Sequence, residues 1–323
     1  MLEMSKQDLI ISAHSKGYRP EILEKVYRLL DLLEQFMSVS YLKERLVLKG
    51  GTAINLFCSQ GLPRLSVDLD FNYIGSTDRD VMRKEKIQLE DILIDVAQRR
   101  RYELHRNPRA HAGGKMIFVY QSFLGNKGRL EVDINYILRV PLWRINWCSS
   151  SGWPKPTQTA ILDIHELAAG KLHALLGREA SRDLFDSHRL LTQWDLDKQK
   201  LRLAFTIYAG MERDDWQRLH VDQVKFSVKD IRDKLIPVLK SNETPNNSSH
   251  EIKEWANRLV ENCKTELLSV LPFQSHEIEF LECLQKHGEI RPDLISNDEN
   301  FNQRVMQHPS LLWRAKQVLT KKN

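Results

Sequence analysis

The fold of this 323-residue chain is decided by the stretch Lys49-Gly-Gly-Thr-Ala-Ile-Asn-Leu56 and by the strand pattern that follows it. The apolar residues just before it predict a short strand over residues 45–49. Gly50 and Gly51 end that strand, and Thr52 begins a short helix that we expect to run through Ser59. The stretch is therefore a strand, a glycine turn and a helix in direct succession.

The next decisive stretch is Ser66-Val-Asp-Leu-Asp-Phe-Asn-Tyr-Ile74, in which polar and apolar side chains alternate strictly. This period of two is typical of a strand with one buried face. Side chains two positions apart point to the same side of a strand. Asp68 and Asp70 are therefore expected to share one face.

The rest of the first half supplies helices and a hairpin. Apolar residues at helical spacing predict one or two helices over residues 5–42 with Ser5 as the cap, and a charged helix is expected over residues 79–101. Two further strands are predicted over residues 115–121 and 129–137, joined at Gly125-Asn-Lys-Gly128. In the second strand Asp133 points to the side opposite Val132 and Ile134.

The second half is predicted to be helical. A Ser, Gly and Pro-rich loop over residues 149–156 marks the change, and helical patterns follow over residues 161–175, 183–193, 198–209, 227–239, 251–268 and 276–286. We therefore expect an α+β domain over residues 1–158, with a mixed sheet and flanking helices, and a mostly α-helical domain over residues 159–323.

Composition narrows the class of protein. Hydrophobic residues make up 41% and charged residues 28% of the chain, which is typical of a globular protein, and no apolar run reaches the length of a membrane span. The first residues lack a secretory pattern, and four scattered cysteines show neither disulfide nor zinc spacing, so we expect a cytoplasmic protein. The net charge of +5 is compatible with a nucleic-acid or nucleoside triphosphate partner without establishing one.

The densest basic stretch holds Arg99, Arg100, Arg101, Arg106 and Arg109. A solvated helix end is its ordinary explanation, and contact with RNA phosphates is the alternative.

The three aspartates indicate a divalent metal. Asp68 and Asp70 lie on one strand face, and a neighbouring strand is expected to bring Asp133 beside them. Such a cluster either raises its pKa values and holds protons or binds a cation. Mg²⁺ is commonly held by one or two carboxylates together with substrate phosphates, and Mn²⁺ is the alternative ion. The competing interpretation is that the aspartates face water on an open sheet.

The glycine turn is a predicted phosphate site. Gly50 and Gly51 lie between a strand and a helix start, where unpaired backbone N–H groups face the loop. Glycine lets the backbone approach a phosphate closely, and the Thr52 hydroxyl would donate a further hydrogen bond.

These residues carry a family resemblance. The run Lys49-Gly-Gly-Thr-Ala-Ile-Asn-Leu56, followed by Arg64-Leu-Ser-Val-Asp-Leu-Asp-Phe71, resembles the opening motifs of the AbiEii/AbiGii toxin family, nucleotidyltransferase-like toxins of bacterial toxin–antitoxin and phage-defence systems in the DNA polymerase β superfamily. Glu166-Leu-Ala-Ala-Gly-Lys-Leu-His-Ala-Leu175 and Arg182-Asp-Leu-Phe-Asp-Ser-His-Arg-Leu190 are similar to the family's downstream motifs. The resemblance covers roughly residues 45–195 and implies a nucleotidyltransferase-type sheet. Phe185 stands where tyrosine is common, and Ser187 where an apolar residue often follows.

The resemblance assigns roles to individual residues. It implies that Asp68 and Asp70 hold metal, that Ser66 lines the triphosphate site, and that Lys171 contacts nucleotide phosphates. Either Asp183 or Asp186 would complete the catalytic set. Asp133 stands in the place of the superfamily's third carboxylate, a residue that not every member of the toxin family keeps.

Lys171 can also be interpreted from its own surroundings. It extends an apolar row of residues 160, 164 and 167 at helical spacing, so it is expected to point toward packed protein and to need an anionic partner, either phosphate or a carboxylate. The alternative is that the lysine snorkels to solvent. Arg182 and Asp183 could similarly form a plain surface ion pair.

Together these patterns predict a metal-dependent nucleotidyltransferase toxin that transfers NMP from an NTP with Mg²⁺ to an acceptor hydroxyl. By resemblance the acceptor is the 3′ end of a tRNA or another RNA, the transfer arrests growth, and a cognate antitoxin encoded nearby, often with a winged-helix part, is the protein partner. Two alternatives stay open: nucleotidylation of a protein hydroxyl, and a non-catalytic module that binds nucleotide or antitoxin.

Overall fold

A computed structural model describes residues 4–59, 61–107, 113–150, 153, 156–212, 216–246 and 248–322. Its contacts divide the chain into two compact units. The first unit holds residues 1–139, 145–162 and 237–244, and the second holds residues 140–144, 163–236 and 245–323. The first unit extends beyond residue 158, where the sequence placed the domain boundary, because a strand over Gln158–Ile161 joins its sheet.

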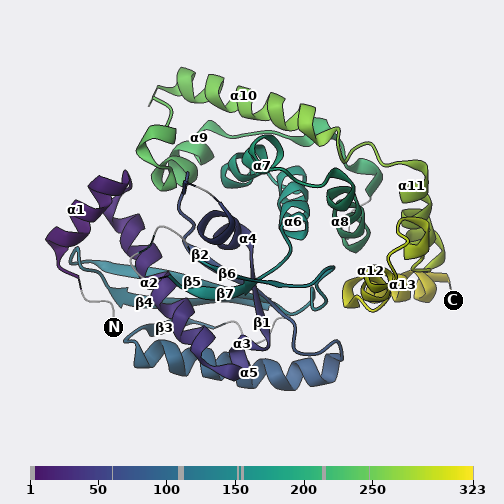
Figure 1. Cartoon of the computed structure of the whole chain (residues 1–323), viewed down its shortest axis with the longest axis horizontal. Coiled ribbons are helices and arrows are strands. Elements are labelled where there is room, and N and C mark those ends of the chain that lie inside the picture. Colours follow the sequence, from purple (N-terminus) through teal and green to yellow (C-terminus); the bar gives the residue numbers. More distant parts are fainter. Residues whose placement is uncertain are drawn as a thin grey trace. The chain divides into compact units, whose positions relative to one another are not determined.

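The first unit is built on a seven-stranded mixed sheet, which confirms the predicted fold class (Figure 1). The strand order is β3-β4-β5-β2-β1-β7-β6. The strands are β1 (Leu46–Lys49), β2 (Asp68–Tyr73), β3 (Glu103–Arg106), β4 (Gly113–Gln121), β5 (Lys127–Asn135), β6 (Asn146–Ser149) and β7 (Gln158–Ile161). β2 pairs with β5 in parallel and with β1 in antiparallel orientation, and β4 and β5 form the predicted hairpin.

Helices α1 (Lys6–Lys16), α2 (Pro20–Ser38), α3 (Ser40–Lys43) and α5 (Arg79–Arg99) accompany this sheet. Ser5 caps α1 as predicted, because its hydroxyl accepts the Asp8 backbone N–H at 3.1 Å. α2 has a pronounced apolar face and contacts β2, β5 and β7. The guanidinium of Arg28 on α2 lies over the Tyr120 ring of β4 at 4.3 Å, and Tyr120 is on the same face of the sheet as the buried Val132 of β5. The apolar face of the sheet is therefore the face toward α2.

The second unit is helical, as expected. Its main helices are α6 (Ile164–Gly177), α7 (Ser181–Gln193), α8 (Lys198–Met211), α10 (Ser249–Leu267), α11 (Ser275–Glu282), α12 (Glu299–Met306) and α13 (Pro309–Lys322). Short helical segments separate them: η2 (Trp216–Arg218), η3 (Val221–Gln223), α9 (Val228–Asp230), η4 (Ile231–Leu235), η5 (Ile236–Val238, which ends in the first unit), η7 (Cys283–His287) and η8 (Pro292–Leu294). α6 packs against both α7 and α8 (Figure 1).

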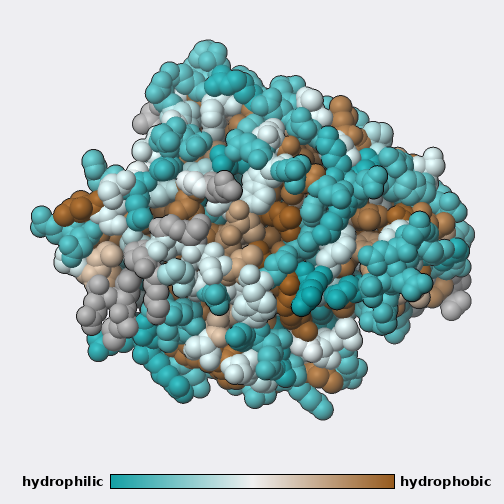
Figure 2. Space-filling view, in the orientation of Figure 1, coloured by the Kyte–Doolittle hydropathy of each residue, from teal (hydrophilic) through white to brown (hydrophobic). Residues whose placement is uncertain are grey.

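Hydrophilic side chains predominate on the face seen in Figure 2. Among the described residues we find no helix with the length and apolar character needed to cross a membrane.

One buried carboxylate ties α2 to the β4–β5 hairpin. Glu24 is 1% exposed and accepts hydrogen bonds from the Ser122 hydroxyl at 2.6 Å, the Phe123 backbone N–H at 3.0 Å and Arg28 Nε at 2.7 Å. A buried charge is tolerated when its lone pairs are satisfied in this way.

We therefore predict that Glu24→Ala lowers the free energy of unfolding by about 3 to 5 kcal/mol, because it leaves the buried donors and Arg28 without their shared acceptor. Glu21→Ala, at an exposed position on the same helix, is expected to cost at most about 1 kcal/mol. Urea denaturation of both variants measures the difference. Equal losses would show that the Glu24 hydrogen bonds do not hold the hairpin in place.

Candidate functional site

At the glycine turn the backbone passes close to the Asp70 carboxylate of β2. β1 ends at Lys49, and Gly50 follows with a φ of +70°, a conformation that favours glycine. A Cβ placed on Gly50 would lie 2.6 Å from Oδ2 of Asp70. A Cβ on Gly51 would lie 2.8 Å from an Arg64 Nη atom and 3.0 Å from Oγ of Ser66. A larger side chain at either position would therefore displace a neighbouring side chain: Asp70 at Gly50, and Arg64 or Ser66 at Gly51.

The predicted helix after the turn begins as α4 (Gly50–Thr52) and continues as a π-helix, η1 (Ala53–Cys58). The Thr52 hydroxyl is buried and donates to the backbone carbonyl oxygen of Asp68. The structure thus gives this hydroxyl an internal acceptor in place of the phosphate oxygen that the sequence suggested. Thr52 fixes the start of the helix to β2.

The carboxylates lie on adjacent strands in matching register. Asp70 of β2 is the direct partner of Asp133 of β5, and Asp68 is the partner of Glu131. Leu69 and Val132, which alternate with them, are buried on the opposite face. Asp68, Asp70 and Asp133 therefore share the face that points away from α2.

Two lysines flank this row. Lys49 is the register partner of Asp70 on β1, and Lys115 of β4 is the partner of Asp133, so a line across four strands reads Lys49, Asp70, Asp133, Lys115. Lys115 Nζ also lies 2.7 Å from the Glu131 carboxylate. Lys115 was absent from the sequence-based site, because only strand pairing brings it to the aspartates.

The charge balance at Asp70 still disfavours its ionised form. Burial raises the pKa of Asp70 above its ordinary value; Lys49 opposes the shift, whereas Asp68 and Asp133 increase it, and Lys115 lowers it again. The two lysines thus do not fully offset burial and the neighbouring carboxylates. An additional cation would favour the ionised carboxylate.

Arg64 is a second residue that the sequence-based site lacked. It is 2% exposed, its guanidinium donates to the Leu65 carbonyl oxygen at 3.0 Å, and it lies beside Gly51 and Ser66. Ser66 is itself 5% exposed. The signal for Arg64 was present in the run Arg64-Leu-Ser-Val-Asp, yet nothing in the local pattern showed that the arginine would be buried next to the glycine turn.

The carboxylates on β2 suit a metal ion whose remaining ligands come from the substrate. In the described part of the chain, no three His, Cys, Asp or Glu side chains form a group that could hold a metal ion by themselves. Asp68 and Asp70 offer two carboxylates on one strand face, which is the usual protein contribution to Mg²⁺, with phosphate oxygens and water as the other ligands. The residues are therefore compatible with the ion, and the roles of Asp68, Asp70 and Asp133 stay predictions.

The second unit gathers the downstream motif residues. Lys171 of α6 lies 2.8 Å from Oδ1 of Asp183 and 3.2 Å from Oδ2 of Asp186, both on α7. Arg178 Nε lies 2.7 Å from Oδ2 of Asp183. Lys171 is 10% exposed, so it does not snorkel to solvent. Asp183 is 2% exposed, so its interactions are not a plain surface ion pair.

One part of the sequence argument for Lys171 is wrong. Residue 160 was counted in its helical row, but Ala160 belongs to β7 and α6 begins at Ile164. Lys171 is inward all the same, because its partners lie on the packed helix α7. Burial acts to raise the pKa of Asp183, but the positive charges of Lys171 and Arg178 outweigh burial and lower this pKa below its ordinary value. The expectation that Lys171 and the β2 aspartates serve one reaction remains a prediction.

Comparison with known proteins identifies one matching family model and a solved structure of similar fold. Residues 31–270 match the family model described as "Nucleotidyl transferase AbiEii toxin, Type IV TA system". MenT4, a nucleotidyltransferase toxin from Mycobacterium tuberculosis H37Rv, has a similar solved structure, with a TM-score of 0.58 and 16% sequence identity over 94% of this chain and 98% of that one. This likeness shows a shared fold. The search of curated proteins finds no match.

We predict that Gly50→Ala displaces the Asp70 carboxylate, because the added methyl would meet Oδ2 at 2.6 Å. Gly61→Ala is the matched control, since Gly61 has a similar φ of +78° but nothing within 4 Å of an added Cβ. Both variants should lose about 1 kcal/mol of stability from backbone strain. Only Gly50→Ala should also weaken Mn²⁺ binding, measured by electron paramagnetic resonance. Equal Mn²⁺ affinity in the two variants would argue against the role of this close approach.

We also predict that Lys171→Met lowers the free energy of unfolding by about 3 to 5 kcal/mol at pH 7, because it removes the cation that two buried carboxylates share. Since the pKa of Asp183 is lowered in the folded protein, its contribution is present above the unfolded pKa and is lost as pH falls. The difference between variant and wild type should therefore narrow at about pH 3, below the pKa of an unfolded aspartate.

The matched control is Lys234→Met, which removes an ion pair to Asp230 whose lysine is 62% exposed. Its cost should not exceed about 1 kcal/mol, because solvent screens an exposed pair. Denaturant unfolding at both pH values provides the measurement. A pH-independent loss in Lys171→Met would contradict the electrostatic explanation.

Proposed function

This chain belongs to the AbiEii family of nucleotidyltransferase toxins from type IV toxin–antitoxin systems, and from that premise we propose that it transfers a nucleoside monophosphate from an NTP to the 3′ hydroxyl of an RNA acceptor, a tRNA by family resemblance. The family assignment implies an antitoxin partner and a nucleotide substrate. The RNA acceptor and the requirement for Mg²⁺ are parts of the proposal.

The observation that carries the proposal is the carboxylate row beside the glycine turn. Asp68 and Asp70 share a face, Asp133 is in register with Asp70, and the backbone of Gly50 packs closely against the Asp70 carboxylate. Burial and the neighbouring carboxylates raise the pKa of Asp70, which favours occupation by a cation. Binding alone has little need for such an arrangement of like charges.

Each group has a task in the transfer. The oxygen of the acceptor hydroxyl forms a bond to the α-phosphorus of the NTP, the bond from that phosphorus to the bridging oxygen of pyrophosphate breaks, and the hydroxyl proton is released. Asp68 and Asp70 would hold Mg²⁺, which supplies charge stabilisation for the attacking and leaving oxygens. The backbone at Gly50 and Gly51, with Ser66 and the buried Arg64, would bind the triphosphate.

Asp133 would complete the acidic face as a metal ligand or as an acceptor of the hydroxyl proton, because it lies directly opposite Asp70. Lys171 is proposed to contact nucleotide phosphates, and Asp183 and Asp186 hold its ammonium group in place. Asp183 also forms an ion pair with Arg178.

The experiment is to incubate the purified chain with each α-labelled NTP, Mg²⁺ or Mn²⁺, and total RNA. We expect label in RNA for the wild type, and a loss of at least about 100-fold in Asp68→Asn and Asp70→Asn, because the metal ligands are removed. The matched control is Asp95→Asn, at an exposed position on α5, which should retain wild-type activity. Sequencing of RNA 3′ ends identifies the acceptor and the base added.

Other outcomes select the alternatives. Label that migrates with protein would replace the RNA acceptor with a protein hydroxyl. NTP binding without transfer to any acceptor would favour a non-catalytic module. Transfer that survives in both aspartate variants would refute the assignment of the site.

A further inference from the structure

The polar face of the sheet does not end at the aspartates. Because side chains alternate along β5, Arg129 lies on the same face as Glu131 and Asp133. Arg129 pairs in register with Val119 of β4, and Val119 pairs with Glu103 of β3. The carboxylate row therefore continues toward the β3 edge as one surface within the first unit.

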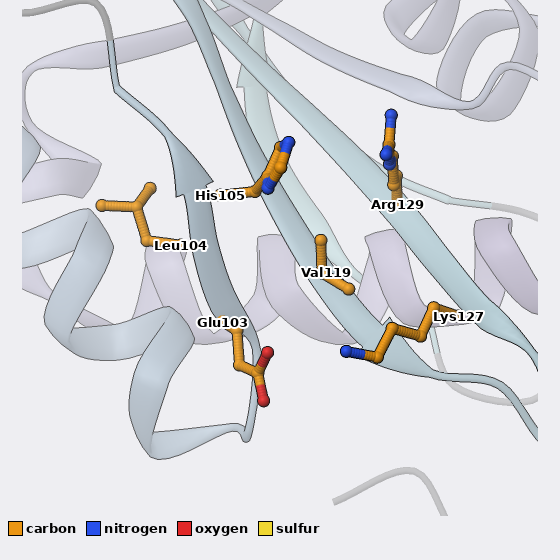
Figure 3. Close-up of a pocket in the computed structure, with 6 residues that line it drawn as sticks. All are labelled: Glu103, Leu104, His105, Val119, Lys127 and Arg129. Carbon is orange, nitrogen blue, oxygen red and sulfur yellow. The ribbon is translucent and has the colours of Figure 1, made fainter.

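This part of the face is hollowed. A depression of about 260 Å³ is lined by Glu103, Leu104, His105, Val119, Lys127 and Arg129. Figure 3 shows Val119 between β3 and β5, with the side chains of His105 and Arg129 on either side of it. We call the exposed residues His105, Lys127 and Arg129, together with Val119, the β3–β5 basic surface.

The two cationic side chains of this surface, Lys127 and Arg129, are available to a ligand. Lys127 and Arg129 are exposed, and no described residue forms an ion pair with either of them. Lys115, nearer the aspartates, is paired with Glu131 at 2.7 Å. Glu103 is the one carboxylate that lines the depression, so the described lining carries a net positive charge even with His105 neutral.

The chemistry matches a single-stranded RNA better than a mononucleotide. An apolar floor between an imidazole and a guanidinium plane provides stacking contacts for a base, and two exposed cations suit the phosphates on either side of it. Arg129 and Asp133 are four residues apart on β5, or about 13 Å at 3.3 Å per residue. About four stacked nucleotides at 3.4 Å each would cover that distance.

We propose that the β3–β5 basic surface binds the acceptor RNA a few nucleotides before the hydroxyl that reacts at the aspartates. This inference rests on the proposed function, since it assigns the route of the RNA acceptor. It also moves the expected RNA contact away from the Arg99–Arg101 stretch. There Arg100 is paired with Asp31, and Arg109 lies outside the described residues.

The test uses the full chain with Lys127→Gln and Arg129→Gln combined. The probe is a fluorescent single-stranded oligoribonucleotide, followed by anisotropy at several KCl concentrations. We expect affinity to fall about tenfold, and the slope of log K against log salt to decrease by about 1.4, since each phosphate contact on a single strand contributes about 0.7. In the transfer assay KM for RNA should rise, while kcat at saturating RNA and KM for NTP stay unchanged.

The matched control is Arg83→Gln combined with Lys84→Gln, which removes the same charge from exposed positions on α5. It should leave RNA affinity and the salt slope near the wild-type values. An equal fall in both double variants would reduce the effect to net charge and overturn the assigned surface.

The two proposals fail in different ways. If the wild type labels RNA and the β3–β5 double variant keeps the same KM for RNA, transfer stands and the surface is wrong. If the wild type binds the oligoribonucleotide without labelling any RNA, and the double variant binds it more weakly, the surface stands and the transfer proposal is wrong. A wild type that binds no RNA overturns the surface directly.

Discussion

The parallel pairing of β2 with β5 is the constraint on which the candidate site depends. It places Asp70 directly opposite Asp133 in a sheet whose other face is buried. A shift of either strand by one residue would turn its aspartates into the core and its apolar side chains to the outside. The hydrophobic pattern therefore holds two like charges side by side, at an electrostatic cost that Lys49 and Lys115 only partly offset.

The aspartates of the two units differ in how completely their charge is balanced. Asp70 has a raised pKa even though two lysines act on it, whereas Lys171 and Arg178 lower the pKa of Asp183 below its ordinary value. The carboxylates on α7 therefore already have their cations. Asp70 favours a further positive charge, which is the electrostatic reason for proposing a metal ion beside it.

Backbone approach and side-chain burial work together around the glycine turn. Gly50 and Gly51 lie so close to Asp70, Arg64 and Ser66 that an added Cβ would displace these side chains, and the Thr52 hydroxyl ties the start of the helix to β2. The glycine turn, the buried Arg64 and the carboxylate strand β2 therefore pack tightly against one another. Farther along the same face of the sheet lie the exposed basic residues of β4 and β5.

The sequence by itself determined what local periodicity encodes: the shared face of Asp68 and Asp70, the glycine turn after β1, the hairpin and the helical second half. The tertiary structure fixed the register that puts Asp133 opposite Asp70, and it alone brought Lys115 beside Asp133, Arg64 beside the glycine turn and Ala160 into β7. The four-residue strands β3, β6 and β7 were not predicted, because segments so short show little periodicity of their own. The last two helices, α12 and α13, were also missed, although each has an amphipathic pattern. Pairings between residues some 60 positions apart depend on which buried faces fit together, and no local pattern records that.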